Sequence, residues 1–294
     1  MIRTIAFLSL LAMPFAAAAQ GKLDAVRDAV DRPRSTDDSR TETTDDSSSS
    51  CVTSGDGSAS GPDGSSGVDN IFLLVAGAPW VAPHELLDPG LRVDGRFTHY
   101  PYAAPDTGHM VLNRKEAVNE GVPGFFDRTD ANWYSVRGAV EVGSDFDHLT
   151  RVGLRLFVDT DCRFGLKTDW DYYTERLPCG CRDEMCIGDL TATFRFVQNE
   201  HIVMHTGAGA RFLLDHGGDR GGINFLYGFD AFPVQPVHLF GSFEAGTLSA
   251  ATVWRARGGV GVNWKYAELY AGYDCLNIGG VAMQGPFIGL QLWY

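Results

Sequence analysis

The last nine residues of the chain read PFIGLQLWY, from Pro286 to Tyr294. Apolar or aromatic side chains stand at every second position, namely Ile288, Leu290, Leu292 and Tyr294, in alternation with Phe287, Gly289, Gln291 and Trp293. Successive side chains of a β-strand point to opposite faces, so this alternation predicts a strand with two different faces. This strand is the last element that the sequence predicts.

The same period of two continues through the chain from Asn132 onward. We predict strands at about 91–100, 133–143, 149–159, 188–198, 201–213, 222–231, 237–247, 251–264, 266–275 and 286–294. Charged residues away from the strand tips fall on one face. For example, Val152 and Leu154 oppose Arg151 and Arg155. A soluble β-sandwich alternates in the same way, so the pattern alone predicts only an all-β protein.

Strand length and connector length favour a membrane barrel. The strands run for about ten residues, which a tilted strand needs to cross a bilayer, whereas globular strands average about five or six. If Tyr294 marks the inner end, the inner turns are short, at 264–266, 231–237, 198–201 and 143–149. The outer connections are 275–286, 247–251, 213–222, 159–188 and 101–132, several of them long. We therefore predict an antiparallel up-and-down transmembrane β-barrel of 8 to 10 strands.

The end of the chain resembles the C-terminal assembly signal of small bacterial outer-membrane β-barrel proteins. It has the aromatic Tyr294 last, the apolar Leu292 two residues before it and Gly289 five before it, although Phe287 stands at a polar position of that signal. The resemblance implies that the last strand pairs with the first, that barrel-assembly machinery and outer-membrane lipid are partners, and that the protein lies in the cell outer membrane. Aromatic residues expected at the inner membrane interface are Phe229, Trp264 and Tyr294.

The N-terminal part predicts export. Residues 1–20 hold a basic start, an apolar run and a small-residue exit, which is the pattern of a secretory signal peptide. We interpret 21–68 as an acidic, Ser/Asp-rich disordered linker, within which Leu23, Val26 and Val30 have helical spacing. Residues 69–294 are then the barrel. The formal net charge of −13 argues against nucleic acid as a partner.

The predicted lumen face carries charges of both signs in similar number. Its charged residues are Arg137, Glu141, Arg151, Arg155, Asp159, Arg195, Arg211, Asp230, Glu244, Arg255, Arg257 and Glu268. In a small barrel, side chains fill the interior, so these charges are expected to pair and to plug it. The alternative is a narrow pore for small solutes, with an anion-selective constriction.

The predicted outer loop 159–188 contains Cys162, Cys179, Cys181 and Cys186. In an exported protein these four residues predict two disulfides that staple the loop, rather than a zinc site. The same loop holds Trp170, Tyr172 and Tyr173 among carboxylates, a combination that suits binding of a sugar or of a protein surface. The alternative is that these aromatic residues only cover the barrel mouth or contact lipopolysaccharide.

No residue pattern identifies an active site. His201 and His205 are four residues apart on one strand, about 13 Å at strand rise, as are His238 and Ser242. We therefore assign no catalytic residue, no metal site and no cofactor. The function that we predict is a structural or surface-binding barrel rather than an enzyme. A secreted soluble ligand-binding β-barrel and an outer-membrane enzyme remain as further alternatives.

Overall fold

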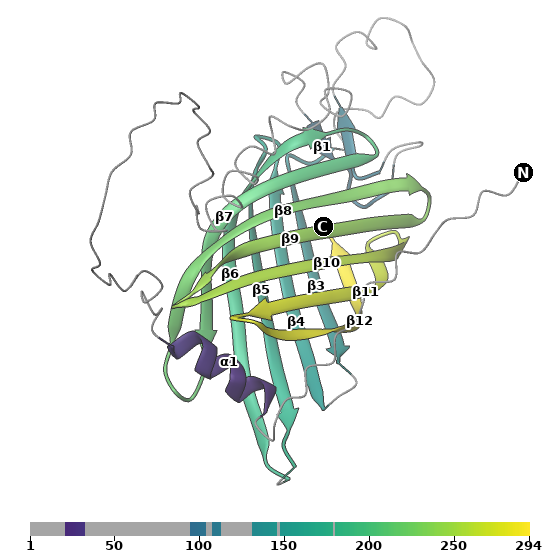
Figure 1. Ribbon diagram of the computed structural model, residues 1–294. Helices are drawn as coiled ribbons and strands as arrows, with labels where there is room; N and C mark the ends of the chain where they lie inside the picture. Colours follow the sequence, from purple (N-terminus) through teal and green to yellow (C-terminus); the bar gives the residue numbers. More distant parts are fainter. Residues whose placement is uncertain (1–20, 33–94, 104–107, 113–130, 146–147, 179) are drawn as a thin grey trace, which may run out of the picture.

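The computed structural model describes residues 21–32, 95–103, 108–112, 131–145, 148–178 and 180–294. Ten strands form a closed antiparallel barrel, which confirms the predicted all-β, up-and-down fold (Figure 1). The strands are β3 (Tyr134–Ser144), β4 (Leu149–Thr160), β5 (Phe164–Arg176), β6 (Arg182–Gln198), β7 (Ile202–Leu214), β8 (Arg220–Val234), β9 (Val237–Leu248), β10 (Ala251–Trp264), β11 (Ala267–Ile278) and β12 (Val281–Trp293).

Each strand of the ring pairs with its neighbours in sequence, and the C-terminal strand closes the ring. β12 pairs with β3 from Phe287↔Gly143 to Trp293↔Arg137. The last residue adds two more bonds, since the Val136 N–H donates to the Tyr294 carbonyl and the Tyr294 N–H donates to the Val136 carbonyl. In a closed ring every strand has a neighbour on both sides, so the sheet has no edge strand.

The strand predicted at 91–100 is not part of the barrel. Its described portion contains β1 (Gly95–Phe97), which pairs with β2 (Met110–Leu112) in a separate two-stranded sheet. The tenth barrel strand is β5, which lies inside the segment predicted as the outer loop 159–188. This prediction was wrong: β5 carries Lys167, Asp169 and Asp171 in the middle of a strand, where they face the lumen.

The connection predicted at 275–286 is also wrong. β11 continues to Ile278 and β12 begins at Val281, so only Gly279 and Gly280 join them, both with positive φ (57° and 95°). Such two-residue turns match the twist of paired strands and require glycine-like conformations. Pro286 is tolerated inside β12 because β12 has no β3 partner on the N-terminal side of Phe287.

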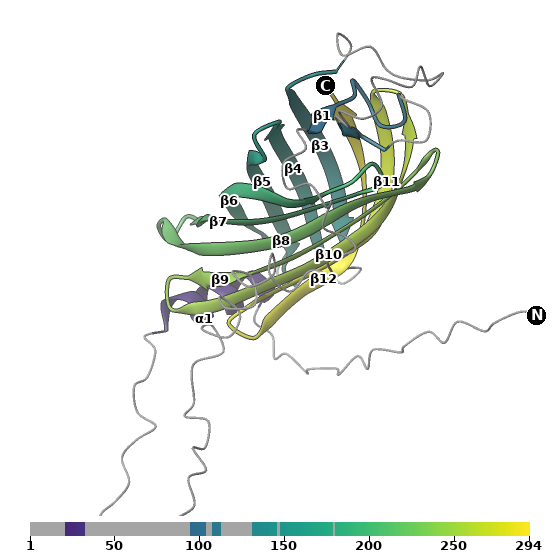
Figure 2. The ribbon, with the colours of Figure 1, turned by 90° about the horizontal axis from the view of Figure 1, so that it is seen from above.

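Because β5 was not among the predicted strands, its presence changes which connectors lie at the same end of the barrel. We call the end that holds Tyr294 the hairpin end, because β1 and β2 lie there, and the opposite end the helix end (Figures 1 and 2). The connector at 143–149, predicted at the Tyr294 end, lies at the helix end. At both ends the barrel strands are joined by short connectors.

The helix end is covered by α1 (Lys22–Asp31), which lies within the segment predicted as a disordered linker. Its helical spacing was predicted correctly, since Leu23, Val26 and Val30 form one buried face. Among the described residues, no helix has the length and apolar character needed to cross a membrane. The predicted signal peptide, the rest of the linker and residues 69–94 lie outside the described residues.

Candidate functional site in the barrel lumen

The inner wall of the barrel carries its charged side chains, as the alternation predicts. All twelve lumen charges predicted from the sequence lie on the inner face and are buried or half-buried. The sequence interpretation missed Lys167, Asp169 and Asp171, which β5 adds to the same face, and also Asp189 on β6. The sequence contains the signal for a strand at Lys167, Asp169 and Asp171, because these charges alternate with Leu166, Thr168, Trp170 and Tyr172.

Glu141 is the most highly connected carboxylate of the described lumen. Arg151 donates to its Oε1 at 3.0 Å and Arg155 at 2.5 Å, while Arg257 donates to both of its oxygens. The Tyr270 hydroxyl donates to Oε2 at 3.2 Å. Three guanidinium groups around one buried carboxylate leave an excess of positive charge, and the neighbouring aspartates must supply the remaining negative charge.

Ion pairs cross the full width of the lumen. Arg255 on β10 donates to Asp171 on β5 at 2.6 Å, and Arg137 on β3 donates to Asp230 on β8 at 2.9 Å. In a ring of ten strands, β10 lies opposite β5 and β3 lies opposite β8. The two pairs therefore bridge opposite walls by direct hydrogen bonds.

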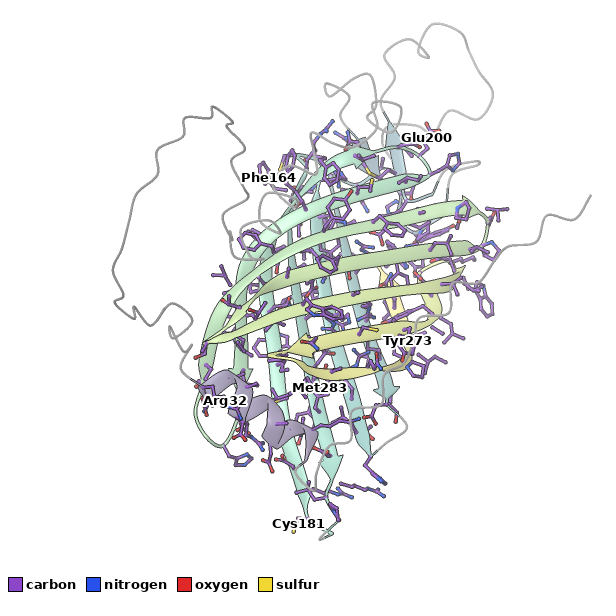
Figure 3. All side chains as sticks on the ribbon, in the orientation of Figure 1. Arg32, Phe164, Cys181, Glu200, Tyr273 and Met283 are labelled. Carbon is purple, nitrogen blue, oxygen red and sulfur yellow. The ribbon has the colours of Figure 1, made fainter. Side chains whose placement is uncertain are left out.

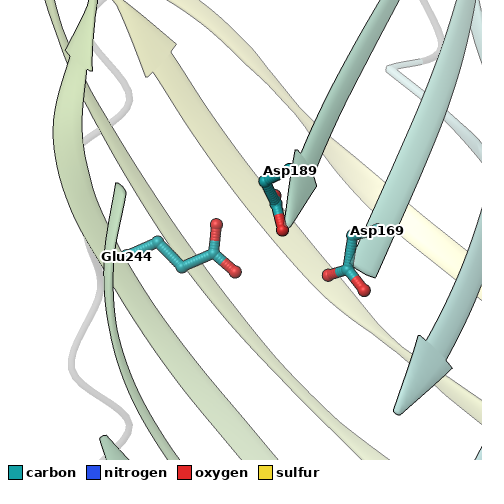
Figure 4. Close-up of side chains that lie close together, drawn as sticks. All are labelled: Asp169, Asp189 and Glu244. Carbon is teal, nitrogen blue, oxygen red and sulfur yellow. The ribbon is translucent and has the colours of Figure 1, made fainter. Parts of the chain in front are cut away.

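Three carboxylates from β5, β6 and β9 converge in the lumen, namely Asp169, Asp189 and Glu244 (Figure 4). One ligand oxygen from each lies within 4.8 Å of the others. Lys167 Nζ lies 2.8 Å from both Asp169 and Glu244, and Arg211 lies 2.5 Å from Glu244. Lys167 thus bridges Asp169 and Glu244, whereas the cation that pairs with Asp189 is Arg211, at 3.7 Å.

The histidines are held by carboxylates or aromatic rings. His238 lies between Glu268, 2.7 Å from its Nδ1, and Asp230, 3.2 Å from its Nε2. It is not bonded to Ser242, so the pair considered in the sequence does not meet. His205 points inward and stacks near Phe157, with ring centroids 5.4 Å apart.

A serine and a histidine do meet at the hairpin end. His109, just before β2, lies with its Nε2 2.7 Å from the Ser135 hydroxyl, and its Nδ1 is 3.4 Å from the Thr98 hydroxyl. Burial lowers the pKa of His109 to about 3, and the nearby Arg137 charge acts in the same direction. The adjoining cavity has a volume of about 20 Å³, room for one water molecule, and the His109–Ser135 contact ties the hairpin to β3.

The main cavity of the described lumen has a volume of about 110 Å³. Its charged lining is mostly cationic: Arg137, Arg155, Lys167 and Arg257 against Asp169 and Asp230. At roughly 30 Å³ for each water molecule, it has space for a few waters or one small anion.

The residues predicted to bind a ligand do not form a loop site. Trp170, Tyr172 and Tyr173 belong to β5, where Tyr172 is 42 % exposed on the outer wall and Tyr173 is 3 % exposed in the lumen. Tyr172 and Tyr173 lie on opposite faces because neighbouring residues of a strand point in opposite directions.

The predicted disulfide staple is not found among the described cysteines. Cys162, Cys181, Cys186 and Cys275 form no disulfide with one another, and Cys179 lies outside the described residues. β5 separates Cys162, beside Phe164 at the hairpin end, from Cys181 at the tip of the helix end (Figure 3). A bridge between these two residues would have to span the height of the barrel.

Comparison with known proteins assigns no family. No protein-family model matches the sequence, and no curated protein is similar to it. The functional argument therefore depends on the geometry of the barrel.

Proposed function

We propose that the protein spans the outer membrane as a sealed barrel with a structural or surface-binding role. The observation that carries this proposal is the composition of the outer wall. On the outer face of the ten strands, the only charged side chains are Arg176, Arg182 and Glu184, all at the helix-end tips of β5 and β6. The rest of the wall is apolar, aromatic or small, apart from Asn277 and Gln284 in the helix-end parts of β11 and β12.

An apolar wall of this extent is unfavourable in water. Leu154, Leu269 and Ile288 are 57 %, 58 % and 55 % exposed, on separate strands around the ring. Soluble monomers rarely expose a continuous apolar patch of more than a few hundred Å². A bilayer removes this surface from water, and a closed barrel meets it with no unsatisfied strand edge.

The interior supports a sealed barrel rather than an open channel. The pairs Arg255–Asp171 and Arg137–Asp230 bridge opposite walls, and β1 and β2 lie at one mouth (Figure 1). The resemblance of the C-terminal strand supports recognition by barrel-assembly machinery, with Tyr294 and Trp264 at one interface. The outer-loop ligand site expected from the sequence loses its support, because that segment contains β5.

A narrow anion pore is the second candidate. The cationic lining of the 110 Å³ cavity favours it, because Arg155 and Arg257 would meet an anion that entered the lumen. In this case replacement of either arginine changes ion selectivity.

The test is reconstitution of the full chain in lipid vesicles. Flotation with the vesicles and faster gel migration of the unboiled sample are the expected results. Single-channel recording should then show no steady current. Protein that stays in the aqueous fraction overturns the membrane proposal, whereas a current that depends on Arg257 replaces the sealed barrel with the pore.

A further inference from the structure

The lumen changes character at the helix end. Its inward-facing side chains are charged in the middle of the barrel but apolar at this mouth. We call the apolar set the mouth cluster; it comprises Leu149, Tyr173, Met185, Ile187, Leu213, Leu248, Ala251, Val253, Leu276, Ile278 and Met283, each at most 4 % exposed. Each mouth of a membrane-spanning barrel opens toward water, so these side chains stay buried only while something covers them.

In this structure the cover is α1. Leu23, Val26 and Val30 belong to the same apolar cluster and are fully buried. They stand at positions i, i+3 and i+7, which is one face of a helix. The mouth cluster is therefore shaped to receive the apolar face of a short helix.

Carboxylates on the rim of the mouth hold the polar side of α1. Arg27 donates to Asp183 at 2.7 Å and to Asp215 at 2.6 Å, and Lys22 pairs with Asp145. The backbone N–H groups of Lys22 and Leu23 each donate to Glu175 at 2.9 Å. Arg220 on the same rim pairs with Asp31 near the C-terminus of α1. This rim therefore favours a helix that brings cations and its positive N-terminus to the carboxylates and an anion to Arg220.

The connectivity of the chain conflicts with a seated α1 in a membrane. α1 lies at the helix end, while β1 begins at the hairpin end, so residues 32–94 must join the two ends (Figures 1 and 2). Polar backbone cannot cross the hydrocarbon outside the barrel. It cannot pass inside either, because direct ion pairs bridge opposite walls of the lumen. When a bilayer surrounds the wall, α1 cannot be docked at the helix end while the β1–β2 hairpin is docked at the hairpin end.

The segment that leaves is α1. The β1–β2 hairpin is bonded to the chain just before β3, since the Phe97 N–H donates to the Asn132 carbonyl and the Asn132 N–H donates to the Phe97 carbonyl. Gly108 also donates to Glu200, and His109 to or from Ser135. α1 is joined to the hairpin only through the long segment that precedes Gly95.

We propose that the mouth cluster and its charged rim are a receptor site for an amphipathic helix of a partner protein that carries cations at the positions of Lys22 and Arg27. α1 is a self-ligand that occupies the site before the barrel enters the membrane and vacates it on insertion. This inference rests on the proposed membrane location, because only a surrounding bilayer makes the two docked ends incompatible.

The probe is a synthetic peptide with the sequence of residues 21–32, labelled with a fluorophore. It is added to the full chain in vesicles, and to the V26D variant, in which an aspartate on the apolar face stops the chain's own α1 from docking. The expected result is saturable binding of equal affinity to both proteins. A peptide with Arg27→Ala should bind roughly tenfold or more weakly, because it loses charge-assisted hydrogen bonds.

Each other outcome overturns part of the inference. Binding to V26D alone means that α1 stays seated in the bilayer. Binding to neither protein, although both float with the vesicles, rejects the receptor site. Binding in a lipid-free amphipathic polymer that is lost in vesicles means that lipid fills the mouth. If the wild-type chain does not float, the proposed membrane location fails instead, and peptide binding to V26D in solution still decides whether the mouth is a receptor.

Discussion

Replacement of Glu141 by glutamine tests whether the lumen charges hold the barrel together. Glu141 pairs with Arg151, Arg155 and Arg257 and accepts a hydrogen bond from Tyr270. Arg151 and Arg155 each have a second carboxylate within 4 Å. For Arg257, Glu141 is the only carboxylate partner among the described residues. The E141Q change therefore leaves the Arg257 charge buried without a counter-charge.

The expected cost follows from this geometry. Breaking a buried ion pair by removing one partner costs about 3–5 kcal/mol, because the remaining charge is uncompensated. At about 1.4 kcal/mol per factor of ten, the folding equilibrium constant falls by roughly two to three and a half orders of magnitude. The E141Q/R257M double variant should recover much of this loss, because no unpaired charge remains.

The free energy of unfolding is measured by urea titration of the chain in vesicles, with heat-modifiable gel migration to count folded molecules. Val140→Ala is the matched control, since Val140 is the neighbouring residue on the outer wall and is 54 % exposed. A cost below about 1 kcal/mol for E141Q, the median of exposed pairs, would refute a tightly packed ion network. A double variant no more stable than E141Q would show that Arg257 is compensated elsewhere.

Three further predictions concern the wall and the two ends. Leu154→Arg on the outer wall should lower folding stability in vesicles by about 2–4 kcal/mol, and an equal stability of the two proteins would contradict the lipid-facing assignment. Burial lowers the pKa of His109 to about 3, so the contact between His109 and Ser135 is fully stable above the ordinary value of 6.5. Below that value the docked hairpin loses about 1.4 kcal/mol of stability per pH unit. Acid should therefore expose the β1–β2 hairpin to protease, and His109→Gln should abolish this pH dependence. The hydrogen bond from Arg27 lowers the pKa of Asp215, so the contribution of this pair to α1 docking is present above the ordinary value of 3.8 and disappears as pH falls through the lower, docked value. A spin label on Asp28→Cys, on the exposed face of α1, should become mobile in that range in the chain before insertion, and Asp215→Asn should remove the step.

The charges of β5 show where sequence reasoning failed on the fold. Lys167, Asp169 and Asp171 alternate strictly with Leu166, Thr168 and Trp170, yet three charges and an aromatic cluster resemble a polar loop when each residue is considered alone. The period of two was the better guide, because a lumen accepts charges in the middle of a strand. The same rule would have extended β12 through Gly285 and Pro286.

Local pattern in the sequence was enough to determine the all-β class, the inner and outer faces of most strands and the helical face of α1. These features depend on neighbouring residues, through the alternation of a strand or the turn of a helix. The tertiary structure decided the partners: Arg255 meets Asp171 and Arg137 meets Asp230 because ring closure places their strands on opposite walls. It also placed α1 and β1 at opposite mouths, since contacts between distant segments depend on closure and register, which no local period encodes.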